Sequence, residues 1–415
     1  MAVTNPPNYA DLFHRRILQN VSYWRDFVTA HGEDMAALDG ERDGILKALG
    51  YALDVADAWP PAYEVMTHYS LHLERRGTWE GWNPLLEQAV RRAEESGDLA
   101  AAVNLSTLLA RLCQRQSRPA ETIRHYRRVI SLARRLNDAF SLARACTNLG
   151  YLYTEQGRWW RAEILCCAAL AIFERIHSDH GRAHAENHLG FLYIRQCLWE
   201  QARQRLERAC SLWQEMGDSH GLMRGFINQS ALYLEREHPD PNEALVFLEK
   251  ALQQARLTGE EGEIGRISAN MAIAYRLKGE LLQAEVYSQQ AEAVFRRFSD
   301  SLELARLWSN RGLIYLDQKE WPKAYSFLKA SLEMWRSLHY KYGEVEVLLH
   351  LANYDLAREQ HQQAAIQLDK LEHLIEVYCE EAQCRPLQLL LRKYRHSLTE
   401  DSTKTTEAIA TPVVK

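Results

Sequence analysis

The stretch Asn148-Leu149-Gly150-Tyr151-Leu152-Tyr153 decides the fold, because its glycine and its last tyrosine belong to two columns that recur along the chain. A small residue returns every 40 residues, with one interval of 42, at Ser70, Ala110, Gly150, Gly190, Ser230, Ala272, Gly312 and Ala352. A tyrosine follows three residues after five consecutive members, at Tyr153, Tyr193, Tyr233, Tyr275 and Tyr315. Self-similarity at such a period predicts a repeat array rather than one compact core.

Each repeat is expected to contain two helices, A and B, joined by a short turn. Small residues are needed where the helices of a hairpin approach closely, and the tyrosine fills the space beside them. The turn signals lie in register with this division. Between repeats they are Gly97-Asp98, Asn137-Asp138, Gly217-Asp218 and Ser299-Asp300, and within repeats they are Gly77, Gly157 and Gly279. The interval of 42 contains two prolines in residues 236–242, which lengthen one turn.

The run at 148–153, followed by Ala162 and Ala169, resembles the tetratricopeptide repeat over residues 61–375. The resemblance implies an all-α fold, a right-handed superhelical solenoid of antiparallel helix pairs. The period of 40 exceeds the usual value of about 34, so each helix pair should be longer by about one and a half turns. HEAT-type repeats share this period but lack the two columns. The match is weaker at the ends, where Leu73, Cys113 and Asp355 replace the tyrosine.

The repeats suggest a division of the chain into four segments. We expect an N-terminal helical pair or cap at 1–60, an eight-repeat solenoid at 61–378, a C-terminal capping helix at 379–398 and a disordered tail at 399–415. The first segment is predicted to hold helices at 9–30 and 36–58, ending at Trp59-Pro60-Pro61.

The N-terminal run Tyr23-Trp24-x2-Phe27, with Leu38-x2-Glu41-Arg42-Asp43 after it, is more particular. It resembles the segment that opens the repeat arm of bacterial STAND-class signalling ATPases and of related transcriptional activators. In those proteins the arm senses an inducer or partner for an NTPase. This sequence contains no G-x4-G-K-[ST] phosphate loop. The resemblance therefore implies a detached sensor or adaptor arm.

Two polar columns of helix A are predicted to bind the partner, because these positions face the concave surface in tetratricopeptide proteins. They lie six and two residues before the small residue, so they share one helix face. Arginine offers a fork of charged donors, and asparagine pairs with both groups of an extended backbone. The alternative is that Asn bridges helices and Arg pairs with acids such as Glu155, Glu235 or Asp317. The predicted partner-binding residues, called the ladder, are Arg144, Asn148, His184, His188, Arg224, Asn228, Arg266, Asn270, Arg306 and Asn310.

His180, His184 and His188 are spaced by four, and imidazoles at that spacing can chelate zinc on a helix face. Ladder membership already explains His184 and His188, so we predict no metal site. The pair could instead make capture pH-dependent near 6 to 7. The eight cysteines include no C-x-x-C pair and are expected to be reduced and structural.

Composition narrows the function classes. The net charge of -5 gives no global reason to attract nucleic acid, and no stretch approaches 18 apolar residues, so we expect a cytoplasmic protein that binds neither nucleic acid nor membrane. No nucleophile elbow, acid pair or His-Glu-x-x-His motif occurs. We therefore predict no catalytic residue, no cofactor and no enzymatic activity.

The predicted function is a protein- or peptide-binding adaptor, or the sensor arm of a regulatory complex. Its concave surface would hold an extended, acidic partner segment. The alternative is a sensor of a small molecule or signalling peptide, whose ligand changes the superhelix and so regulates a separate effector. The expected partner is a protein or peptide, such as a separately encoded NTPase or protease.

Overall fold

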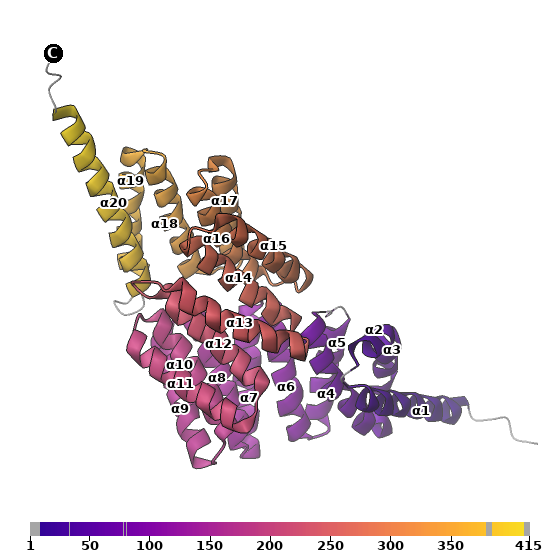
Figure 1. The fold of residues 1–415 in the computed structure, drawn as a ribbon. Coiled ribbons are helices and arrows are strands. Elements are labelled where there is room, and N and C mark those ends of the chain that lie inside the picture. Colours follow the sequence, from indigo (N-terminus) through magenta and orange to yellow (C-terminus); the bar gives the residue numbers. More distant parts are fainter. Residues whose placement is uncertain (1–8, 33, 78, 80, 379–383, 411–415) are drawn as a thin grey trace, which may run out of the picture. The chain divides into compact units, whose positions relative to one another are not determined.

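A computed structural model describes residues 9–32, 34–77, 79, 81–378 and 384–410. Within these residues every element is a helix, and consecutive helices pair along the chain, as predicted (Figure 1). The chain divides into two compact units, residues 1–145 and 146–415, which are described one at a time. The predicted segments that begin at 1 and 379 and the one that ends at 415 extend outside the described residues.

The first unit holds the N-terminal helices, and α8 spans the boundary between the units. The predicted helix at 36–58 is broken into α2, α3 and a short 3-10 turn, with the first break at Gly40, a residue that ends helices readily. Pro60 and Pro61 lie in the first turn of α4, where a missing N–H costs nothing. The elements are α1 Tyr9–Ala30, α2 Met35–Gly40, α3 Arg42–Ala52, η1 Ala56–Ala58, α4 Trp59–Arg76, α5 Trp82–Glu95, α6 Leu99–Arg115, α7 Pro119–Leu136 and α8 Ala139–Glu155.

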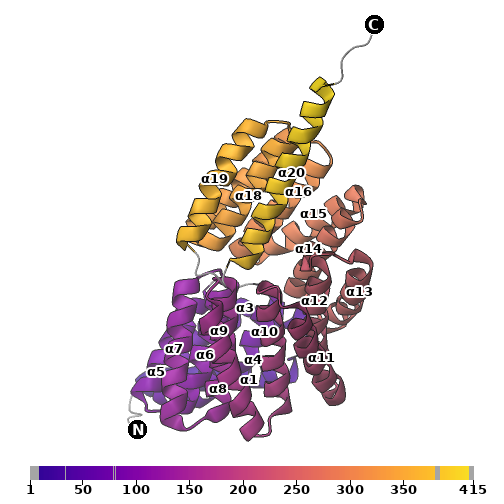
Figure 2. The same ribbon diagram turned by 90° about the vertical axis from the view of Figure 1, so that its left-hand side faces the viewer.

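The second unit continues the alternation, with even-numbered A helices and odd-numbered B helices up to α19 (Figure 2). Each A helix from α10 to α16 contacts its own B helix and also the next A helix. The A helices therefore form one continuous layer. The elements are α9 Trp159–Arg175, α10 Asp179–Arg195, α11 Trp199–Met216, α12 Ser219–Glu235, α13 Pro241–Thr258, α14 Glu261–Leu277, α15 Leu281–Arg297, α16 Ser301–Asp317, α17 Trp321–Ser337, α18 Lys341–Ala357, α19 His361–Tyr378 and α20 Arg385–Ala410.

The predicted turns are confirmed. The aspartates that follow each unit cap the next A helix, their carboxylates accepting an N–H three residues on, at Asp98, Asp138, Asp218 and Asp300. The glycines within repeats adopt the left-handed conformation that favours glycine, with φ of 73° at Gly77, 72° at Gly157 and 79° at Gly279.

The column of small residues is confirmed as a close helix approach. A Cβ added at Gly190 would lie 2.6 Å from a methyl carbon of Leu206 on α11. A second close approach joins successive repeats, where an aromatic residue ending a B helix lies against a glycine eight residues later. A Cβ at Gly221 would lie 2.4 Å from Trp213, and one at Gly343 would lie 2.5 Å from Trp335. Both contacts fix the spacing of the A-helix layer.

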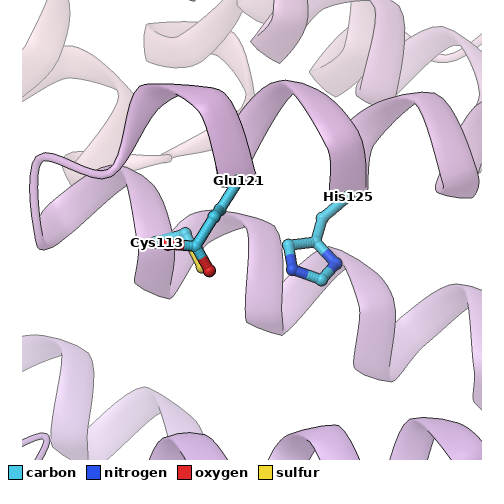
Figure 3. Close-up of side chains that lie close together, drawn as sticks. All are labelled: Cys113, Glu121 and His125. Atoms are coloured by element: carbon cyan, nitrogen blue, oxygen red, sulfur yellow. The ribbon is translucent and has the colours of Figure 1, made fainter.

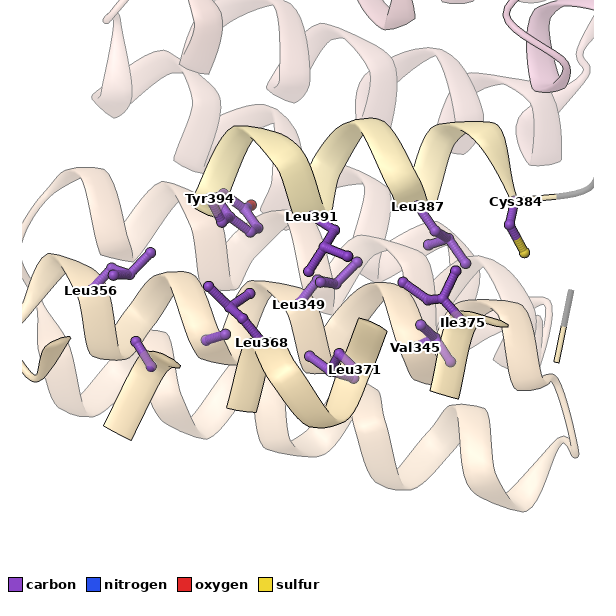
Figure 4. Close-up of a cluster of buried hydrophobic side chains, with 12 residues drawn as sticks. Val345, Leu349, Leu356, Leu368, Leu371, Ile375, Cys384, Leu387, Leu391 and Tyr394 are labelled. Atoms are coloured by element: carbon purple, nitrogen blue, oxygen red, sulfur yellow. The ribbon is translucent and has the colours of Figure 1, made fainter. Parts of the chain in front are cut away.

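The last helix covers the end of the array. Leu387, Leu391 and Tyr394 of α20 pack with α18 and α19 in one apolar cluster, as Figure 4 shows. The hydroxyl of Tyr394 lies 2.9 Å from Nδ1 of His350 on α18. The helix then runs to Ala410, where the sequence predicts a disordered tail, because residues 399–410 contain no glycine or proline to end it.

Cys384, directly before α20, is disulfide-bonded, so the expectation of reduced cysteines is wrong there. It lies in the connection between α19 and α20 rather than at an apolar helix position. Six cysteines elsewhere in the described residues are free, as predicted.

Candidate functional site

The ladder lies on the A helices, with Arg144 on the part of α8 that belongs to the first unit and the other members in the second. The arginines and asparagines are half-buried, whereas His188 is only 3% exposed. The structure brings several members together with acids and tyrosines of the same layer. It thereby tests the two interpretations of the ladder at particular positions.

Arg306 of α16 is held by two acids of the chain itself. Its guanidinium donates to Glu155 at the end of α8, with 2.5 Å between nitrogen and oxygen, and to Glu303 one turn earlier, at 3.2 Å. Glu155 is 4% exposed, while the Arg306 side chain keeps 39% of its surface accessible. This arginine is therefore paired with acids from within, yet open to solvent on one side.

Arg266 of α14 is held in the same way. It lies 3.4 Å from Glu263 and 3.6 Å from Glu303, and it donates to the hydroxyl of Tyr151 on α8 at 3.3 Å. Together with the Arg306 pair, this contact joins α8 to helices three and four repeats later in the chain. We call Tyr151, Glu155, Arg266, Glu303 and Arg306 the cross-layer cluster.

Charges in this cluster are balanced. Burial raises the pKa of Glu155, but Arg306, Arg195 and Arg266 outweigh it, so that the pKa falls below its usual range and the carboxylate is ionised. Burial, helped by Glu155, raises the pKa of Tyr151 to about 12, so its hydroxyl stays neutral. The alternative anticipated from the sequence, arginines paired with acids such as Glu155, is what the structure has at Arg266 and Arg306.

A second group of charges lies on α10, α12 and α18. Arg195 donates to Glu235 at 3.1 Å and lies 5.1 Å from the ring centre of Tyr342. Glu346 occupies the arginine column of α18 but makes no hydrogen bond or ion pair within the described part of the chain. Burial raises its pKa despite the attraction of Arg195 and of Arg306. This carboxylate is the weakly satisfied member of the layer.

The asparagines divide into two pairs. Asn228 donates to Asn187 of the neighbouring A helix at 3.0 Å, and Asn270 donates to Ser230 at 3.5 Å, so these two bridge helices. The side-chain amides of Asn148 and Asn310 make no hydrogen bond to any described residue. The latter two can therefore still donate and accept.

The histidines form a close pair but no metal centre. Their Nε2 atoms lie 3.4 Å apart, while His180 turns to Asp218 at 3.5 Å. In the described portion of the chain no third cysteine, histidine or carboxylate joins the pair. Burial, with Arg224 and Arg266, lowers the pKa of His188 to about 3, so His188 cannot make capture pH-dependent near 6 to 7. That hypothesis is wrong for this residue because the site is dry and positively charged.

One surface pocket of about 400 Å³ opens beside α10 and α11. Arg182, Glu186, Glu207 and Arg208 are among its lining residues, and no ladder residue lines it. Glu186 is already bound by Arg205 at 2.9 Å. The pocket is polar and shallow, so the cross-layer cluster remains the stronger candidate for binding.

Known proteins similar to this chain were then compared with it. The tetratricopeptide repeat family model matches residues 99–175 and 303–372. A search of curated proteins found no match. None of the described helices has the length and apolar character needed to cross a membrane.

Solved structures share the fold at low sequence identity. A Rap protein complexed with competence and sporulation factor has 12% identity and a TM-score of 0.61, covering 88% of this chain and 98% of that one. The Rap conjugation gene regulator of plasmid pLS20, in complex with a Phr peptide, has 10% identity and a TM-score of 0.56, covering 88% and 98%. Aspartyl phosphate phosphatase F from Bacillus subtilis has 11% identity and a TM-score of 0.51, covering 90% and 95%.

A STAND protein with a tetratricopeptide sensor from Pyrococcus horikoshii also matches, with 13% identity and a TM-score of 0.49 over 86% of this chain and 56% of that one.

Proposed function

Because the chain is a tetratricopeptide-repeat protein whose ladder arginines are held by its own acids, we propose that it senses an extended signalling peptide and regulates a separate effector protein. A carboxylate of the peptide exchanges with Glu155 at Arg306. This is the sensor alternative raised by the sequence, with a peptide as the ligand.

The observation that carries the proposal is the Glu155–Arg306 ion pair together with the Tyr151–Arg266 bond. Arg306 is the kind of group that binds a peptide carboxylate, because guanidinium holds two oxygens at once. Its accessible surface of 39% leaves room for such an oxygen to approach. The free amides of Asn148 and Asn310 are suited to pair with a peptide backbone.

Exchange at Arg306 distinguishes a sensor from a simple holder. A ligand shifts a conformational equilibrium only if it interacts differently with the two states. A peptide carboxylate that replaces Glu155 removes the bond between α8 and α16, so binding and helix rearrangement become one event. The fold neighbours solved with a sporulation factor and with a Phr peptide support a peptide as the ligand class.

The effector is a separately encoded protein, and an NTPase or protease is the class we favour. The absence of enzymatic activity stays a prediction, since one fold neighbour is named as an aspartyl phosphate phosphatase and fold alone does not carry function. Incubation of the purified chain with an aspartyl-phosphorylated receiver domain tests it. Unchanged phosphate release is the expected result.

Binding of labelled synthetic peptides of equal length, one glutamate-rich, one lysine-rich and one neutral, tests the proposed exchange by fluorescence anisotropy. We expect the glutamate-rich peptide to bind best. Glu155→Gln should tighten its binding by about tenfold because Arg306 loses its competitor, whereas Arg306→Gln should weaken it by at least tenfold.

Arg203→Gln is the matched control, because this exposed arginine of α11 also holds two glutamates. If Glu155→Gln and Arg306→Gln change binding in the same direction, or neither changes it, the exchange does not occur. Preference for the lysine-rich peptide would equally contradict the proposal.

A further inference from the structure

Cys113, Glu121 and His125 bring together three different metal-ligating side chains in the first unit (Figure 3). Cys113 lies near the end of α6, and the other two lie one turn apart on α7. The sulfur, a carboxylate oxygen and an imidazole nitrogen all lie within 4.8 Å of one another. None of these residues belongs to the ladder, so the cluster is independent of the proposed peptide site.

The cluster occupies a position that other repeats fill with a paired contact. The tyrosine of the repeat motif meets an aromatic residue of helix B in two repeats, Tyr275 with Tyr287 at 5.2 Å and Tyr315 with Phe327 at 5.4 Å between ring centres. The partner lies 12 residues after the tyrosine in both. His125 stands at the same distance after Cys113. Both members of the aromatic pair are thus replaced, and both replacements are metal ligands.

The replacement leaves His125 unsatisfied. The residue is 5% exposed, and neither of its ring nitrogens has a hydrogen-bond partner among the described residues. A comparable polar replacement near the other end of the array is satisfied, since Gln367 donates to Asp355 at 2.8 Å. A buried polar atom without a partner costs about 1–3 kcal/mol. Some group absent from the protein chain is therefore expected to meet the imidazole.

The neighbouring charges permit a cation here. Arg118 donates to Glu121 with 2.6 Å between Nε and Oε1, and Arg124 lies 3.5 Å from Oε2. A carboxylate has about four lone-pair positions, so it can accept from arginine and still ligate a metal. Ligating carboxylates are usually oriented by such outer hydrogen bonds. The arginines disfavour a bare cation, which makes the thiolate of Cys113 necessary for charge balance.

We propose that Cys113, Glu121 and His125 bind a divalent transition metal ion, with Zn²⁺ as the best fit, and so join α6 to α7. Thiolate with imidazole favours zinc over magnesium or calcium, which prefer oxygen ligands. The thiol loses its proton to solvent on binding. Three protein ligands leave a fourth position for water, which can reach the ion past Glu121, whose side chain is 30% exposed.

Titration of the chelator-treated full chain with Co²⁺ tests the site, because thiolate ligation gives a near-ultraviolet charge-transfer band that Zn²⁺ then abolishes. We expect one equivalent to bind. Cys113→Ser should remove the band, and His125→Phe should weaken binding by at least tenfold. The double variant Cys113→Tyr with His125→Phe restores the aromatic pair of other repeats and should lose the band while keeping the circular dichroism of the parent.

Two further variants locate the ion. Cys167→Ser removes an exposed free thiol of α9, and His184→Asn removes one of the paired histidines. Both should bind Co²⁺ like the parent. A band that is absent from the parent, that survives in the double variant, or that disappears in Cys167→Ser or His184→Asn would overturn the proposal.

Discussion

Glu155 and Arg306 lie 151 residues apart in the chain, yet their carboxylate and guanidinium form an ion pair at 2.5 Å. Glu155 ends α8 and Arg306 lies within α16. Contacts in repeat arrays are usually confined to neighbouring repeats. The pair therefore gives the second unit a bond that its periodicity does not require.

Arg266→Ala should destabilise the protein, although a ladder residue devoted only to a partner could be removed at no cost to stability. The substitution leaves Glu263, which is 2% exposed, and the hydroxyl of Tyr151 without their donor. We expect the free energy of unfolding to fall by about 1–3 kcal/mol. Urea unfolding followed by circular dichroism measures it. Arg203→Ala, at a site with 46% of the side chain exposed, should change it far less, and equal losses in both would contradict the buried network.

Glu346→Gln should stabilise the folded state at high pH. Burial raises the pKa of Glu346, so its contribution to stability is present below the unfolded pKa and is lost as pH rises through the folded one. The variant should melt roughly 1–3 °C above the parent at pH 8, and the difference should shrink toward pH 4. Glu215→Gln, at an exposed position of α11, removes the same charge and should show no such trend. A variant that melts lower at pH 8 would disprove the assignment.

His350→Gln should reduce acid sensitivity. Burial, Arg276 and Lys393 lower the pKa of His350 to about 3, so between there and the unfolded value near 6.5 the unfolded chain holds a proton that the folded chain does not. Stability therefore falls as pH drops through this window. The melting temperature of the variant should decline less than that of the parent between pH 7 and pH 5. His373→Gln, 80% exposed, serves as the control and should follow the parent.

Gly221→Ala should weaken the contact between successive repeats. The new Cβ would lie 2.4 Å from Trp213, so the indole or the helix must shift, at a cost of about 1–3 kcal/mol in the free energy of unfolding. Gly50→Ala is the opposite case, because nothing lies within 4 Å of its added Cβ in α3. Removing a helical glycine there should stabilise by about 0.5–1 kcal/mol. Chemical denaturation of both variants decides, and a neutral Gly221→Ala would contradict the close approach.

The sequence predicts the helices and turns well because their determinants are periodic. Gly190 and Asp218 each act on residues of their own or the next helix, so their columns reveal their roles. A second column escaped notice, the aromatic residue eight positions before a glycine, as in Trp213 and Gly221. It was visible at the same 40-residue period, but a search confined to one repeat could not show a contact between two.

The candidate site is less predictable because its contacts are not periodic. Tyr151 has no counterpart at its position in the neighbouring repeats, where phenylalanine and alanine stand at 191 and 231. Its bond to Arg266 depends on how several repeats stack in sequence, which no spacing reveals. Glu155 could be named as a partner for an arginine, but not which arginine. The Cys113 and His125 pair was noticed only as a lost tyrosine.

The separation of Glu155 from Arg306 also bears on the order of folding events. Local pairing of helices forms rapidly, whereas a contact across 151 residues must close a long loop, at an entropic cost of roughly 4 kcal/mol. The intervening repeats have to stack before the two side chains can meet. The bond is therefore the last to form during folding and the first to open in the native protein, which places the lowest kinetic barrier of the second unit at the end of α8.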